Sequence, residues 1–158
     1  MILLMGLLCF NFHCMGPDSG SVNYTNDSNL EVACFPSYVS MERGWYIQTY
    51  PDTAIYMPQE KLFYLKPHIG HTIYSDKRVD YLMRDCNVDT VSIYYFDRDT
   101  INRYGWETVQ REYKVLQRYD LSIADIQHLT IRNGCAKIPY PPTAAMSEMR
   151  MYPPYAAQ

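Results

Sequence analysis

Charged residues and histidines are scarce in this chain of 158 residues. Charged side chains make up 20% of it, and the net charge of −3 with a pI near 5.7 provides no cationic field. Because binding to a phosphate backbone depends on such a field, the composition predicts no nucleic-acid partner. The four histidines, at positions 13, 68, 71 and 128, are scattered, which disfavours a metal centre or a histidine general base.

Apolar and aromatic residues are plentiful by comparison. Hydrophobic residues make up 47% of the chain, enough to bury a core, and the length suits one domain. Sixteen residues are tyrosine, a side chain suited to surfaces that are apolar beneath and wet above. This composition is typical of strand-rich exported proteins.

The first 14 residues are apolar and resemble an export signal. Residues 1–12 have the length of a signal-peptide core and are too short to span a bilayer comfortably, although no basic residue precedes Arg43. Cys9 or Cys14 could be acylated, as in a bacterial lipoprotein. Leu8 and His13 stand where a lipoprotein signal prefers a small residue, so acylation, mainly of Cys14, and simple secretion stay open as alternatives. Membrane contact is expected only through such an anchor.

Three further cysteines, Cys34, Cys86 and Cys135, belong to the mature domain. An oxidising compartment would allow one disulfide among them, and their spacing leaves its connectivity open. The same spacing is too wide for a CxxC-type zinc or redox site.

Short apolar runs separated by turn residues predict a mainly β domain over residues 22–142, after a linker at 15–21 and before a flexible tail at 143–158. We expect strands at 21–25, 30–35, 45–50, 62–67, 71–75, 90–96 and 135–141. Residues 90–96 (TVSIYYF) are apolar on both faces, which indicates the middle of a sheet. Short helices are expected at 100–113, interrupted by Gly105, and at 122–129, and residues 76–85 show helical spacing at Val79, Leu82 and Met83. Helix gives way to strand near Tyr113. Ser122, followed three residues later by Asp125, resembles a capping box that opens the helix at 122–129.

These elements fit a single antiparallel β-sandwich, α+β at the margin, with two or three short helices on or beside it. An immunoglobulin-like arrangement is one form that such a sandwich could take.

The run from Asp89 to Leu129 contains the segments WETVQ and YKVLQRYDLS and is followed by IPYPP. In these features the chain resembles an uncharacterised family of small exported proteins and lipoproteins of gut Bacteroidales, over about residues 22–142. The resemblance implies a bacterial cell-envelope protein, in the periplasm or at the outer membrane, without an assigned activity.

Candidates for chemistry are few. His68, His71 and Asp76 form the one cluster that could hold a metal, but they sit at a bend that is equally explained as solvated. The carboxylate pairs Asp97/Asp99 and Asp85/Asp89 stand where caps and turns need them. Trp106, Tyr104 and Tyr113 could form an aromatic binding surface, but their helical spacing favours core positions. No cofactor is indicated.

We therefore expect a non-enzymatic exported envelope protein that binds or assembles with an unknown protein or glycan partner. A small metal-dependent or carboxylate-based hydrolase is the alternative. A third hypothesis, addition of a strand at an exposed sheet edge, would be favoured by a bare edge near residues 45–58. Loops around residues 50–60 are the expected place for function.

The resemblance also implies O-glycosylation at Asp-Thr pairs followed by a small or aliphatic residue, as at Thr53, Thr90 and Thr100. Thr53, in a proline-flanked loop, is the main candidate, whereas turns and caps explain Thr90 and Thr100. We predict that Thr53→Ala removes the mass of a glycan from the natively exported protein. An intact mass that changes only by the substitution itself would contradict this.

Overall fold

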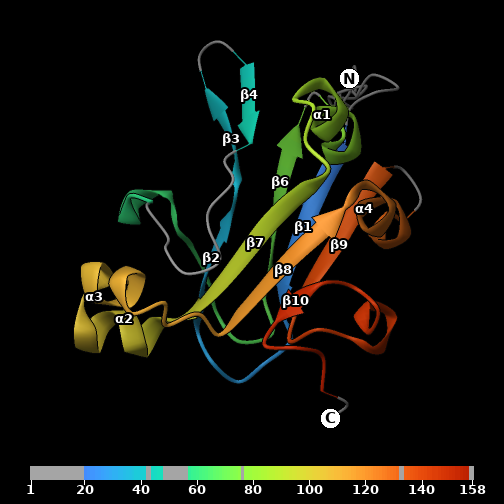
Figure 1. Ribbon diagram of the computed structural model, residues 1–158. Coiled ribbons are helices and arrows are strands. Elements are labelled where there is room, and N and C mark those ends of the chain that lie inside the picture. Colours follow the sequence, from blue (N-terminus) through green and yellow to red (C-terminus); the bar gives the residue numbers. More distant parts are fainter. Residues whose placement is uncertain (1–19, 42–43, 48–56, 76, 132–133, 157–158) are drawn as a thin grey trace, which may run out of the picture.

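Two β-sheets packed face to face dominate the fold (Figure 1). The computed structural model describes residues 20–41, 44–47, 57–75, 77–131 and 134–156. The larger sheet has the strand order β10-β8-β7-β2-β5, from strands Met151–Tyr152, Gln117–Ser122, Thr90–Asp97, Val32–Pro36 and Phe63–Leu65. The smaller sheet has the order β6-β1-β9, from strands Gly70–Ser75, Gly20–Asn26 and Cys135–Tyr140. The predicted mainly β, sandwich-like fold is confirmed.

A two-stranded ribbon, β3 (Tyr38–Met41) and β4 (Gly44–Ile47), projects from this sandwich (Figure 1). The described ranges also contain four short helices: α1 (Val79–Asp85), α2 (Arg98–Tyr104), α3 (Trp106–Arg111) and α4 (Ile123–Leu129). Single 3-10 turns occupy Gln59–Lys61 and Ala144–Met146. Helices α1 and α4 contact each other at one end of the sandwich, whereas α2 and α3 lie at the other end.

Local hydrogen bonds explain where two of these helices begin. The Asp97 carboxylate accepts the backbone N–H groups of Asp99 and Thr100, which caps α2, and Gly105 ends this helix. Ser122 and Asp125 form a reciprocal capping box at α4. Both caps confirm the sequence-based predictions. The predicted strand near Tyr113 begins later, at Gln117, because Tyr113 adopts a positive φ of 50° in a turn.

Strand pairing departs from the expected all-antiparallel arrangement in one place. The β1 and β9 strands pair in parallel, whereas the other strand pairs are antiparallel. The first strand, β1, is also the middle strand of its sheet, whereas an immunoglobulin domain places its first strand at an edge. The immunoglobulin-like form is therefore not the one adopted.

Strand β7 is buried on both faces, as its composition predicts. Val91, Ile93 and Tyr95 point into the core between the sheets, and Tyr94 and Phe96 point to the opposite side. On that opposite side, Phe96 meets the Trp106 ring edge-on at 5.0 Å between centroids, beneath α2 and α3. The sheet thus has a second hydrophobic layer on its outer face.

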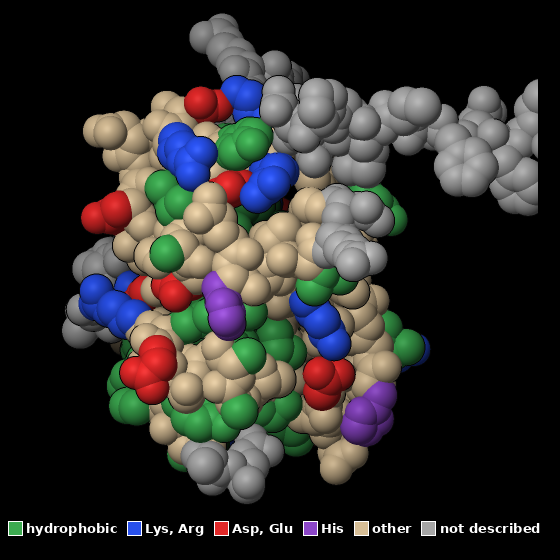
Figure 2. Space-filling model, turned by 90° about the vertical axis from the view of Figure 1, so that its right-hand side faces the viewer, with side chains coloured by type: hydrophobic (Ala, Val, Ile, Leu, Met, Phe, Trp, Pro, Cys, Tyr) green, Lys and Arg blue, Asp and Glu red, His purple; other side chains and the backbone are tan. Residues whose placement is uncertain are grey.

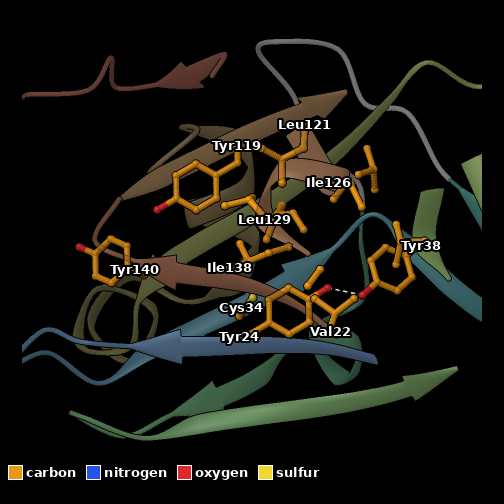
Figure 3. Packing of buried hydrophobic residues seen from close by; sticks show 14 of the residues in the cluster. Val22, Tyr24, Cys34, Tyr38, Tyr119, Leu121, Ile126, Leu129, Ile138 and Tyr140 are labelled. Atoms are coloured by element: carbon orange, nitrogen blue, oxygen red, sulfur yellow. Dashed lines mark hydrogen bonds between the residues drawn. The ribbon is translucent and has the colours of Figure 1, made fainter. Parts of the chain in front are cut away.

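Buried tyrosines supply much of the core between the sheets (Figure 3). The Tyr119 hydroxyl donates to the Pro139 carbonyl at 2.8 Å, and the Tyr95 hydroxyl donates to the Ile138 carbonyl at 3.1 Å. The hydroxyls of Tyr24 and Tyr38 also bond to each other. Burial raises the pKa of Tyr95 and Tyr119, so both stay protonated as donors that tie the larger sheet to β9.

The disulfide that an oxidising compartment would allow is not formed among Cys34, Cys86 and Cys135. Cys34 is fully buried in the main core. Burial raises the pKa of the Cys34 thiol, which disfavours the thiolate needed for exchange. Cys34 therefore packs as a small apolar residue.

Both boundaries of the predicted domain need correction. The chain joins the sandwich two residues early, since β1 already begins at Gly20. The segment after Tyr140, expected to be a flexible tail, packs on the body instead. Met146 and Met149 are buried, β10 pairs with β8, and the Gln117 side-chain amide donates to the Pro153 carbonyl at 3.0 Å. The prolines of this segment indicated a flexible tail, but the methionines between them supply apolar contacts with the body of the domain.

Replacing Trp106 tests the second hydrophobic layer. Trp106 is 8% exposed and its Nε1 donates to the Met57 carbonyl at 2.9 Å. We predict that Trp106→Ala lowers the free energy of unfolding by about 3–5 kcal/mol in urea titrations. Tyr104→Ala, at a position 47% exposed on the neighbouring helix, should change it by less than about 0.5 kcal/mol. Equal losses for both variants would contradict the described packing.

Candidate interaction site at a sheet edge

Strand β6 differs from the other outer strands of the two sheets. The edge strand β10 has two residues and is followed by Pro153, and β5 has three residues. The β9 edge is partly covered, because the Ile131 N–H donates to the Cys135 carbonyl and Thr130 bridges Ala136. Proteins commonly blunt sheet edges by such shortness, proline or cover. Strand β6, with the sequence GHTIYS, has six residues and neither proline nor a Lys, Arg, Asp or Glu residue.

The hydrogen-bond ladder shows which groups of β6 face outward. The Asn26 N–H donates to the Ile69 carbonyl at 3.0 Å, and the Asp27 N–H donates to Tyr140 of the β9 segment at 2.7 Å. Even-numbered residues of β1 therefore bond toward β6, and odd-numbered residues bond toward β9. Because bonded pairs alternate in an antiparallel ladder, the partners of β1 are Ile69, His71, Ile73 and Ser75. The backbone groups of Gly70, Thr72 and Tyr74 point to the edge.

The same three residues share the outer face of the smaller sheet. They lie opposite Thr25, Asn23 and Ser21, which alternate with buried residues of β1. Tyr74 is 71% exposed. A β6 edge with three outward donors, three outward acceptors and an exposed aromatic ring is a surface on which another strand could pair.

A side chain at Gly70 would contact its neighbours on this face. A Cβ atom built on Gly70 would lie 2.8 Å from Asn23 Oδ1 and 3.3 Å from Thr25 Cγ2. The first distance is shorter than real Cβ contacts, so a side chain here would displace Asn23. The side chains of Asn23 and Thr25 therefore occupy the space beside Gly70 at the start of β6.

The two predicted metal-binding histidines have other contacts. The His68 ring Nε2 lies 3.2 Å from Asn29 Oδ1, and the His71 ring packs on Phe63 with centroids 5.0 Å apart. Phe63 in turn contacts Tyr24, so a chain of ring contacts runs from His71 at the edge to the core. Asp76 lies outside the described residues. Within the described ranges, no three His, Cys, Asp or Glu side chains are grouped as a metal site.

The predicted aromatic surface is divided between different environments. Trp106 is buried, as its helical spacing predicts, and Tyr104 is exposed. Tyr113 contacts the Tyr152 ring at 6.0 Å between centroids and accepts a hydrogen bond from Arg118. These rings therefore do not form one platform.

The carboxylates considered for catalysis serve local structure. Asp97 caps α2 and accepts the Thr100 hydroxyl at 2.7 Å, and Asp89 accepts the Thr90 hydroxyl at 3.1 Å. Asp85 pairs with Lys77. The cap interpretation of Thr100 is therefore supported, whereas Thr90 is the first residue of strand β7.

Two open hollows lie beside α1. One of about 610 Å³ is lined by Arg84, Asn87, Val88, Asp89, Thr90 and Ile123. Its neighbour of about 360 Å³ shares Arg84 and adds Lys77, Tyr81 and Asp85. Figure 2 shows positive and negative side chains interspersed on this upper part of the molecule. The linings hold no histidine, cysteine or serine, so they do not assemble a nucleophile with a histidine base.

A buried polar cluster on the outer face of the larger sheet was not predicted. Asp120 accepts the Ser92 hydroxyl and Arg118 Nε, each at 2.7 Å, and Arg150 Nε lies 3.5 Å away. Burial acts to lower the pKa of Arg118, but hydrogen bonds with Tyr113 and Asp120 raise it above its ordinary value. The charges at positions 118 and 120, alternating with buried Tyr119 and Leu121, are the signal that could have revealed this cluster.

Several predicted sites lie outside the described residues: the export signal, Cys9 and Cys14, Thr53, and residues 50–56 of the expected functional loop. The described end of that loop is held against α3, because the Met57 carbonyl accepts hydrogen bonds from Trp106 Nε1 and Gln110 Nε2. Residues 48–56 of the edge anticipated near residues 45–58 also lie outside the described residues, and the exposed edge among the described strands is β6.

Amide hydrogen exchange tests the assignment of the β6 edge. In dilute protein, the amides of Gly70, Thr72 and Tyr74 should exchange fast, because they lack a partner in the ladder. The amides of His71 and Ile73, which bond to β1, should be protected. Uniform protection of all five amides in monomeric protein would show that the edge is covered.

Comparisons with known proteins assign no family to this chain, so the geometry of the described residues is what bears on its function. Searches of family models, curated proteins and solved structures give no match to this chain. None of the helices in the described ranges has the length and apolar character that crossing a membrane requires.

Proposed function

We propose that this chain is a non-enzymatic, exported bacterial envelope protein that binds or assembles by accepting a β-strand at the edge of β6. The observation that carries the proposal is an edge that no described strand pairs with, along which Gly70, Thr72 and Tyr74 direct their backbone groups away from β1. Strand addition uses such groups for affinity and alternate side chains for specificity.

The strength of such an association depends on how many hydrogen bonds form and on how much conformational entropy the two partners lose on binding. Three residues offer six backbone groups, and each bond contributes about 0.5–1.5 kcal/mol net. The edge is held in place beforehand, because β6 is paired with β1 along its whole length. This preorganisation reduces the entropy lost on binding and so favours association.

The hydrolase alternative receives less support from the same structure. Asp85, Asp89 and Asp97 each have a local partner. Arg84 lines both hollows beside α1, one together with Asp89 and the other together with Asp85. A general acid and base would need two carboxyl groups facing one substrate position. Strand addition at β6, by contrast, needs only the backbone groups that Gly70, Thr72 and Tyr74 already direct outward.

Location in the periplasm or at the outer membrane is part of the proposal. It rests on the apolar residues 1–12 and on the resemblance to small exported proteins and lipoproteins described above. Acylation of Cys14 would attach the domain to a membrane, whereas secretion without acylation would leave it in the periplasm.

Photo-cross-linking in cells tests this function. Benzoylphenylalanine placed at Tyr74 of the natively exported chain should give a discrete cross-linked protein on irradiation. Thr72→Pro in the same chain should abolish it, because proline removes an outward N–H but no bond to β1. Mass spectrometry of the cross-linked product identifies the partner.

The matched control places the same probe at Tyr152, an exposed tyrosine on the short edge strand β10. It should give no product that depends on Thr72. A product at Tyr74 that survives Thr72→Pro in a folded variant, or no product at Tyr74 at all, would refute strand addition at this edge.

A further inference from the structure

We infer that the strand accepted by β6 is β6 of a second copy, paired antiparallel and centred on Thr72. This inference rests on the proposed function and names its partner. It would join two smaller sheets into one continuous sheet of six strands, in the order β9-β1-β6-β6-β1-β9.

The register follows from the symmetry of the outward groups. Two identical strands that pair antiparallel across a twofold axis place a central residue opposite itself. Because the outward residues are Gly70, Thr72 and Tyr74, centring on Thr72 matches all three with all three. Thr72 then faces Thr72, and each Gly70 faces a Tyr74. Centring on any other residue leaves one of these three without a counterpart inside the strand.

Side-chain shapes fit this register. Gly70 has no side chain, and Tyr74 is 71% exposed, so the Tyr74 ring of one copy can lie over Gly70 of the other. Cross-strand pairing of an aromatic residue with glycine is a known means of stabilising strands at glycine positions. The two Thr72 side chains meet at the axis, and opposed threonines are favourable cross-strand pairs. On the inner face, His71 lies opposite Ile73.

Charge also favours self-pairing. Like charges directly opposite each other destabilise a strand pair, and a twofold axis places the central side chain against its own copy. The six residues of β6 include no Lys, Arg, Asp or Glu. A protein that avoided this contact would carry a charge here, since charged side chains are a usual protection of exposed edges.

A charge-swap experiment tests both the partner and the register. Wild-type protein should dimerise in sedimentation-equilibrium experiments. Thr72→Lys and Thr72→Glu should each weaken dimerisation by about fivefold at low salt, because like charges then meet at the axis. An equimolar mixture of the two variants should restore dimers that contain one copy of each. Tyr152→Lys, on the edge of the other sheet, should leave dimerisation unchanged.

Each contrary result has a definite meaning once circular dichroism shows that the variants are folded. A monomeric wild type up to its solubility limit overturns self-pairing. A dimer that is insensitive to both Thr72 variants uses another surface, and weakened variants that do not recover on mixing refute the Thr72 register. A monomeric wild type that still cross-links from position 74 to a different protein overturns this inference alone. Loss of that cross-link as well overturns the proposed function.

Discussion

Burial of strand β7 on both faces is the constraint on which the rest of this fold depends. One row of its side chains lies in the core between the sheets, and the other row, with Tyr94 and Phe96, needs cover from elsewhere. Helix α2 begins directly after β7, at the Asp97 cap, and α3 brings Trp106 against Phe96. The sandwich is therefore three layers deep at this end, although each helix has at most two turns. Helices this short are stable only through such packing.

Features that depend on neighbouring residues could be predicted from the sequence, and features that depend on distant pairing could not. The apolar pattern of residues 90–96, the Asp97 cap and the Ser122 capping box are all local, and each was identified. Membership of a sheet is different. Residues 21–25 and 30–35 both show the strand pattern, but nothing in that pattern indicates that β1 and β2 enter opposite sheets or that β1 pairs in parallel with β9.

The candidate site shows the same division. Residues 71–75 were predicted as a strand, but the pattern of a strand does not state whether it has one neighbour or two. Being an edge depends on which strands the rest of the chain leaves unpaired, whereas the prolines near residues 45–58 are a local signal of an edge. Likewise, Arg118 and Asp120 are ordinary strand charges until Ser92 is brought opposite Asp120 by the register of β7 and β8.

The open side of the sandwich links the core to the edge. Tyr24, which is fully buried, contacts Phe63, and Phe63 is covered in turn by His71. This chain of rings covers the core beside β6 with an exposed imidazole rather than with a further strand. An unpaired edge therefore leaves Tyr24 buried, although Ile69 and Tyr74 along it are exposed. An added strand would gain backbone bonds and contact with Tyr74 while leaving the core as it is. Binding at β6 thus requires no rearrangement of the fold.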